Sequence, residues 1–265
     1  MTLGEHLAEL RRRVIISLVA VVVTTVVAYV FHGHILDFVK HPYCQLPAHY
    51  RAISGRCTLV AFGVLDPFTL TLKLSLYAGV IAASPVWLFQ LWRFVTPGLY
   101  AHERRYATAF VGSSVALFAM GAAFAYLTLP EGLHFLLGFA HGGISSLLTF
   151  ANYLSFVTAM VLVFAVSFEL PLLVIMLNLV GVVSATKLRG WWRAVIFGIF
   201  IFAAVATPSQ DPFTMSALAF PMCLLYGVAV LVATVHDRRV AARGPLYANL
   251  ADDELSPIDD EPATR

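Results

Sequence analysis

The sequence predicts an all-α membrane protein with six transmembrane helices and both termini in the cytoplasm. Of its 265 residues, 60% are hydrophobic and only 12% are charged, whereas soluble domains carry about 25% charged residues. The apolar residues form six runs, and Lys and Arg gather in the connections on one side. Because a soluble globule could not cover its surface with so little charge, soluble classes are excluded. The net charge of +2 and the lack of basic runs interleaved with aromatic residues exclude a nucleic-acid partner.

The apolar runs define the expected spans, since a helix needs about 20 apolar residues to cross the hydrocarbon core. The pattern of Thr2 followed by Glu5 is a capping box, which predicts that the first helix begins at Leu3. The fifth run is the shortest, and it predicts a short span or a locally thinned bilayer. The expected spans lie at about residues 14–36, 68–92, 106–129, 153–181, 192–207 and 213–235.

The distribution of Lys and Arg predicts the orientation. With the N-terminus inside, only Lys40, Arg51, Arg56 and Lys73 fall outside, which leaves 13 of the 17 cations on the inner side. Cytoplasmic connections of membrane proteins carry this excess of positive charge. Both termini are therefore expected on the cytoplasmic face.

Two segments outside the spans have their own character. Residues 37–67 are expected to form an ordered extracytoplasmic cap with short helical turns. Cys44 and Cys57 lie in this segment, and their spacing leaves a disulfide and two free thiols equally open. Residues 240–265 have the composition of a disordered acidic cytoplasmic tail. No grouping of ligands predicts a metal or cofactor site, and no nucleophile and base pair predicts an enzyme.

Placing a charged residue in a membrane costs free energy, so each charged residue of so apolar a chain needs an explanation. Before the first span, Glu9 can share a helix face with His6 and can pair with Arg12 or Arg13. Before the third span, Glu103 can interact with the helix dipole. Both clusters can be purely structural, because arginines set the membrane topology and a carboxylate can cap a helix. Alternatively, two carboxylates on one membrane surface form a joint receptor for a dication.

Glu169 and Asp211 are the acidic residues of the later spans. Glu169 lies near the middle of the fourth span, where a charge costs about 3 kcal/mol unless it has a partner, and Pro171 predicts a kink beside it. A polar cavity in the bundle is the functional interpretation. N-capping of the sixth helix is one explanation of Asp211. The other is a turn that lies below the bilayer surface, because the fifth span is short, so that the charge of Asp211 needs a partner. A small proton-coupled secondary carrier that titrates Glu169 is the alternative function.

Four motifs, in this order, resemble the TatC family, the multispanning core subunit of the twin-arginine protein translocase. They are His6-Leu-x-Glu9-Leu-Arg11-x-Arg13, Phe94-x-x-Pro97-x-Leu-Tyr-x-His102-Glu103-Arg104-Arg105, Phe168-Glu169-Leu-Pro171, and Ala206-Thr207-Pro208 with Asp211. The resemblance extends from Thr2 to about Arg239. It implies a glove-shaped bundle with short fifth and sixth helices in the prokaryotic cytoplasmic membrane.

The resemblance also implies a function that is not enzymatic. The family binds Arg-Arg signal peptides on the cytoplasmic face and exports folded proteins with the proton motive force. Its partners are signal peptides of folded cargo, TatA-type and TatB-type single-span subunits, the lipid bilayer, and further copies of itself in the receptor complex. The implied signal-peptide site comprises Glu9, Glu103, His6, Leu7, Arg11, Phe94 and Pro97. Further positions of transport or structural importance are Pro47, Phe68, Pro85, Glu169, Pro171, Pro208 and Asp211.

Overall fold

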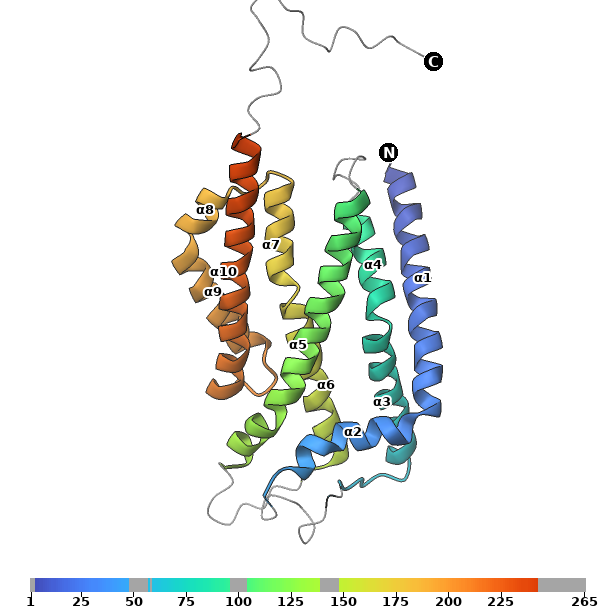
Figure 1. The fold of residues 1–265 in the computed structure, drawn as a ribbon. Coiled ribbons are helices and arrows are strands. Elements are labelled where there is room, and N and C mark those ends of the chain that lie inside the picture. The colour runs from blue at the N-terminus through green and yellow to red at the C-terminus, as the bar shows by residue number, and fades with distance from the viewer. Residues whose placement is uncertain (1–2, 48–56, 58, 96–103, 139–147, 243–265) are drawn as a thin grey trace, which may run out of the picture.

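The computed structural model is all-helical, and it describes residues 3–47, 57, 59–95, 104–138 and 148–242. Figure 1 shows the helices running side by side, with the start of α1 and the end of α10 at the same end of the bundle. Four helical stretches are long and apolar enough to cross a membrane, and the bent pair α3–α4 makes a fifth. The helix α9 is apolar but has only 15 residues. The predicted membrane class is therefore confirmed.

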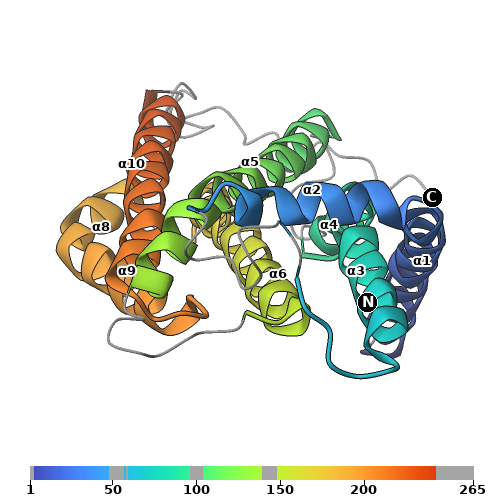
Figure 2. The same cartoon turned by 90° about the horizontal axis from the view of Figure 1, so that it is seen from below.

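The first helix, α1 (Leu3–Val30), ends before the predicted boundary at residue 36, and Thr2 of the predicted capping box lies outside the described residues. The chain turns at Phe31, and α2 (His32–Cys44) then lies across the lower end of the bundle, as Figure 2 shows. The ring of His32 donates a hydrogen bond to the carbonyl of Tyr29, 2.7 Å away, at this turn. Ile35, Leu36 and Val39 of α2 pack against a buried cluster of the protein, so the apolar run continues past the end of the first helix.

The predicted second span is broken into α3 (Asp66–Ala82) and α4 (Ser84–Val95), which meet at an angle of 53°. Pro85 has no N–H group for the helical ladder, so the ladder is interrupted at this point. The indole of Trp87 donates to the carbonyl of Val80 at 3.0 Å and satisfies one exposed acceptor. The predicted span over residues 68–92 thus coincides with a bent pair of helices, and the break itself was not predicted.

The centre of the bundle is formed by α5 (Arg104–Gly138), α6 (Phe150–Ser167) and α7 (Leu170–Leu179). The helix α5 continues through Pro130 beyond the predicted end at residue 129, because Leu129, Leu133 and Leu137 all pack into the main core cluster. The break between α6 and α7 falls at Phe168 and Glu169, so the predicted kink is confirmed. Both stretches together are still long enough for one span.

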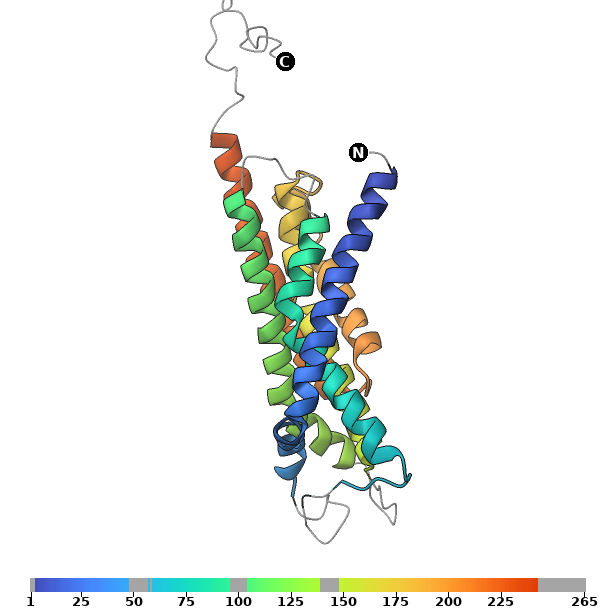
Figure 3. The ribbon, with the colours of Figure 1, turned by 90° about the vertical axis from the view of Figure 1, so that its right-hand side faces the viewer.

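The short helix α8 (Ala185–Gly190) leads into α9 (Trp192–Ala206), and α10 (Pro212–Ala242) follows after a tight turn. Figure 2 shows an elongated cross-section, with α1 at one end and α8, α9 and α10 at the other. In Figure 3 the view along this row shows α1 in front. The buried core lies mainly between α5, α6, α9 and α10, and α4 and α7 extend it.

The α2 cap is firmly attached to the bundle. The hydroxyls of Tyr153 and Tyr126 donate to the carbonyls of Val39 and Phe38, at 2.6 and 2.9 Å. The ring of Phe38 also stacks on Tyr126. Cys44 and Cys57 form a disulfide with their Cα atoms 5.3 Å apart, which decides between the two alternatives left by the sequence. The Cα separation lies within the normal range for a disulfide.

Candidate functional site

A polar pocket of about 180 Å³ lies between α1 and α4, at the end of the bundle where α1 begins. The carboxylate of Glu9 forms an ion pair with Arg13, one turn further along the helix. Arg13 contacts it through Nη2 and also through Nε, which donates to Glu9 Oε1 at 3.2 Å. The spacing predicted Arg12 or Arg13 as the partner of Glu9, and the structure shows Arg13. The pocket is lined by Glu9, Arg12, Arg13, Ile16, Gln90 and Arg93.

One contact between two aromatic rings joins α1 and α4 beside this pocket. His6 stacks on Phe94, with ring centroids 4.6 Å apart and planes 25° from parallel. Leu7 and Arg11 are exposed on the same stretch of α1. The structure thus brings His6, three residues before Glu9 on α1, into contact with Phe94. Pro97 and Glu103 fall outside the described residues.

A second polar cluster is buried in the middle of the bundle at the break between α6 and α7. Glu169 is only 8% exposed. Its Oε2 accepts a hydrogen bond from the hydroxyl of Ser114 at 2.7 Å. The Oγ of Ser114 in turn accepts one from the indole N–H of Trp92, also at 2.7 Å. Glu169 Oε1 is buried and has no hydrogen-bond partner among the described residues. A buried acceptor of this kind can receive a donor from a ligand or partner.

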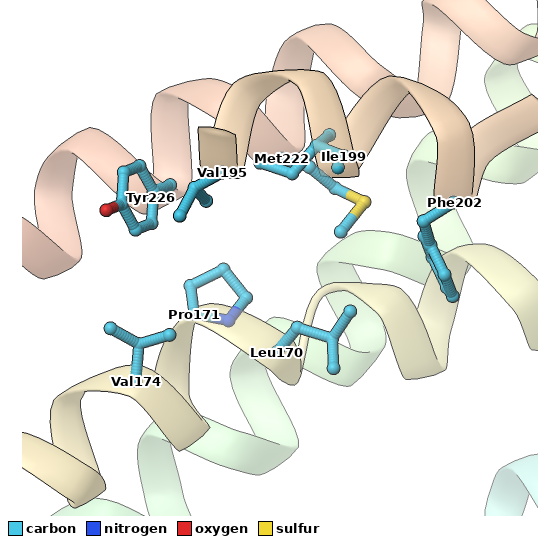
Figure 4. A pocket seen from close by; sticks show the side chains of 9 residues that line it. Leu170, Pro171, Val174, Val195, Ile199, Phe202, Met222 and Tyr226 are labelled. Atoms are coloured by element: carbon cyan, nitrogen blue, oxygen red, sulfur yellow. The ribbon is translucent and has the colours of Figure 1, made fainter. Parts of the chain in front are cut away.

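An apolar cavity of about 340 Å³ opens between α7, α9 and α10. In Figure 4 the side chains of Pro171, Val195 and Met222 point into the space between these helices. Pro171 follows the break at Glu169, so the cavity begins next to the buried polar cluster. Its lining consists of Leu170, Pro171, Val174, Val195, Gly198, Ile199, Phe202, Met222 and Tyr226.

The turn between α9 and α10 has the structural explanation that the sequence offered. Asp211 immediately precedes α10, and its Oδ1 accepts from the backbone N–H of Thr214 at 2.8 Å. Its other oxygen accepts from the hydroxyls of Ser209 and Thr214. Asp211 is therefore an N-cap buried in a small hydroxyl cluster. Pro208 is exposed at the start of this turn.

The remaining implied positions do not form one site. Pro47 is exposed after α2, and Phe68 is 60% exposed in the first turn of α3, both at the lower end of the bundle. Pro85 is exposed at the break between α3 and α4. The polar pocket lies at the opposite end of α1.

Sequence reasoning missed the partners of the acidic residues. Ser114 and Trp92 carry no signal in the sequence, because their contact with Glu169 arises only from packing of separate helices. Asn178 and Asp237 were also missed. Asp237 Oδ1 accepts from the amide of Asn178 at 2.9 Å, and its Oδ2 accepts from the backbone N–H of Ala185 at 2.7 Å, so α10 holds the corner between α7 and α8.

These features define a multi-pass α-helical membrane protein with polar clusters inside and at one end of an apolar bundle. In the part of the chain that the structure describes, no group of three His, Cys, Asp or Glu residues could hold a metal ion. Residues 5–221 match the family model of the Sec-independent protein translocase protein TatC. The chain belongs to the TatC family and is a component of a protein translocase, not an enzyme.

Relatives and solved structures agree with this assignment. The TatC protein of Frankia casuarinae is 56% identical over 266 residues, covering 98% of this chain and 73% of its own. That of Corynebacterium kroppenstedtii is 38% identical and covers 100% of this chain and 69% of its own. A crystal structure of the twin arginine translocase receptor TatC has a TM-score of 0.71 at 33% identity, covering 86% of this chain and 99% of the other. A second has a TM-score of 0.70, covering 88% and 100%.

Proposed function

We propose that the chain is the receptor subunit of twin-arginine translocation and that the pocket at Glu9 binds an arginine of the signal peptide. One observation carries this proposal: the Glu9 carboxylate already holds a guanidinium, that of Arg13. A carboxylate with two oxygens suits the planar fork of an arginine better than the point charge of a lysine. The two crystal structures that resemble the chain are described as twin arginine translocase receptors.

The surrounding residues suit a peptide site at the membrane surface. Arg13 lies on the same helix as Glu9 and is largely buried, whereas the Glu9 side chain keeps 28% of its surface exposed. A signal-peptide arginine can therefore reach the Glu9 carboxylate and compete with Arg13 for it. His6 and Phe94 form an aromatic wall beside Glu9, and Leu7 and Arg11 extend the exposed surface. The resemblance assigns Glu103 as the second carboxylate and Pro97 as part of the same site.

A peptide-binding experiment tests this site. Fluorescence titration of the purified protein compares a twin-arginine signal peptide with the same peptide carrying two lysines. Glu9→Gln should weaken binding of the arginine peptide and abolish the preference over lysine. Glu5→Gln is the matched control, because Glu5 lies one turn earlier on α1 and does not line the pocket. If Glu9→Gln keeps both affinity and preference, Glu9 is not the acceptor.

The topology proposed with this function has six spans and both termini in the cytoplasm of a prokaryotic cell. The spans are α1, the bent pair α3–α4, α5, α6–α7, the short α9, and α10. The excess of Lys and Arg on the proposed inner side supports it. The disulfide in the cap is also compatible with an oxidising compartment on the opposite side. The predicted tail began at residue 240, but α10 continues to Ala242, and residues 243–265 lie outside the described residues. Labelling of single cysteines at residues 5 and 65 with a membrane-impermeant thiol reagent tests the orientation. Labelling of residue 5 from outside the cell would contradict an N-terminus in the cytoplasm.

We assign the buried cluster around Glu169 a role in the transport step, which draws on the proton motive force. Glu169 Oε1 can accept a hydrogen bond from a polar residue of a single-span TatA-type or TatB-type subunit. The apolar cavity beside it, together with the exposed Phe197, Ile201 and Val205 of α9, offers an apolar face for that helix. Assembly of several copies completes the receptor complex.

Two substitutions distinguish a polar contact from a titrating group. Glu169→Gln keeps a hydrogen-bonding side chain but cannot ionise, whereas Glu169→Ala removes both properties. Export by the Gln variant with failure of the Ala variant indicates a contact. Failure of both, with the partner subunits still bound, indicates titration. The carrier alternative is not retained, because family membership places the chain in a protein translocase.

A further inference from the structure

The pocket between α1 and α4 carries more positive charge than a site for arginine alone requires. Three guanidiniums line it, from Arg12, Arg13 and Arg93, whereas Glu9 is the single carboxylate among the described residues of its lining. Glu9 is occupied by Arg13. The described lining of this pocket of about 180 Å³ thus contains no second acidic residue that could neutralise the charges of Arg12 and Arg93. Like charges held this close favour the binding of an anion.

One atom of the pocket also lacks an acceptor. Arg13 Nη1 is buried, and it has no hydrogen-bond partner in the described part of the chain. Its neighbours Nη2 and Nε are both used by Glu9. A buried donor without a partner is uncommon in native proteins. A phosphate oxygen is an acceptor that arginine binds strongly.

The surroundings of the pocket indicate which anion it takes. Ile16 is the apolar residue of its lining, directly where the charged segment of α1 gives way to the apolar run. Val19 and Val23 continue the same helix face and are 54% and 56% exposed. A basic pocket above an exposed apolar wall matches a phospholipid, whose phosphate lies at the surface and whose acyl chains run along the helix. A free phosphate ion would leave this wall uncovered.

We propose that this pocket binds the phosphate of an anionic phospholipid, held by Arg12, Arg13 and Arg93. Such a lipid would neutralise the guanidiniums that otherwise repel an arginine-bearing ligand from Glu9. The lipid site does not depend on the proposed peptide site, because it follows from the charges and the unpaired donor alone.

Native mass spectrometry of the full-length protein in an uncharged detergent tests the proposal without any peptide. The probes are phosphatidylglycerol, phosphatidylcholine with the same acyl chains, and water-soluble glycerol phosphate. Phosphatidylglycerol should bind more tightly than phosphatidylcholine, and glycerol phosphate should not compete at equal concentration. Each guanidinium near a lipid surface contributes about fivefold in affinity. Arg12→Gln with Arg93→Gln should therefore weaken phosphatidylglycerol binding about 25-fold.

The controls separate a specific site from general attraction. Arg238→Gln with Arg239→Gln removes two exposed charges from α10 at the same end of the bundle and should leave binding unchanged. Arg12→Lys with Arg93→Lys keeps the charges and should retain most of the affinity. If the Gln double variant does not fold, the single exposed change Arg12→Gln should still give about a fivefold loss. Equal binding of both lipids, competition by glycerol phosphate, or equal losses in the α10 control would each overturn the proposal. None of these results depends on peptide binding, so the two sites fail separately.

Discussion

Replacing Gly121 by alanine should destabilise the protein by forcing α5 and α6 apart. Gly121 lies on α5 where it passes closest to the backbone of α6. A Cβ atom at this position would lie 2.7 Å from the carbonyl oxygen of Phe164 and 2.9 Å from the Cα of Ala165. Both are backbone atoms, so no side-chain rotation can relieve the contact.

The size of the effect follows from these distances. Ordinary contacts of a Cβ atom begin at 3.4 Å, so the helices must separate by about 0.7 Å at this point. Overpacking of this kind costs about 1–3 kcal/mol. The displaced segment of α6 leads directly to Glu169, whose bond to Ser114 on α5 is 2.7 Å long. We therefore expect Gly121→Ala to weaken that contact as well.

The loss of stability is measured by heating each variant in detergent and recording the fraction of protein that stays monodisperse. Gly112→Ala is the matched control, because Gly112 lies on the same helix and a Cβ atom added there would meet no atom within 4 Å. It should be neutral or slightly stabilising, since alanine favours the helix. If Gly121→Ala and Gly112→Ala unfold at the same temperature, α5 and α6 do not approach each other as closely at Gly121 as described here.

Three further changes test the cap, the buried cluster and the corner between α7 and α8. Cys44→Ser with Cys57→Ser opens a loop with a sequence separation of 13 and should cost about 3 kcal/mol by thermal unfolding; a reductant should lower the midpoint of the wild type but not of this variant. Ser114→Ala leaves Trp92 and Glu169 without the shared hydroxyl and should cost about 1–3 kcal/mol, whereas Ser114→Thr keeps the hydroxyl and should lose less. Asp237→Ala should raise hydrogen exchange of α8 more than Asp237→Asn, and equal protection in both variants would contradict the role given to the carboxylate.

The sequence was sufficient where an interaction is local along the chain. The pairing of Glu9 with Arg13, the kink before Pro171 and the cap at Asp211 all join residues within four positions, so spacing alone predicted them. The break at Pro85 was missed, although the proline was noted. A proline removes one helical hydrogen bond, but the angle that results depends on how neighbours such as Trp87 satisfy the exposed carbonyls.

The end of α1 and the contacts of Glu169 were beyond the sequence for a different reason. Hydropathy does not distinguish a helix that faces lipid from one that packs on protein, so residues 32–36 at the start of α2 were assigned to the first span. Ser114 is a small polar residue of the kind that is common in membrane helices. Only the packing of α5 against the break between α6 and α7 gives it a role.

The ion pair between Glu9 and Arg13 would link the two proposed binding sites at the start of α1. While Arg13 is held by Glu9, one donor of its guanidinium stays buried without an acceptor among the described residues. An arginine that binds Glu9 would release Arg13, and the released guanidinium could turn fully towards an anion beside Arg12 and Arg93. Conversely, a phosphate bound there would draw Arg13 away and open Glu9 to the peptide. The affinities of the two ligands should therefore increase together, because by linkage each must raise the affinity of the other by the same factor. Peptide titrations in nanodiscs with and without phosphatidylglycerol measure this factor, and identical peptide affinities in both would show that the sites are uncoupled.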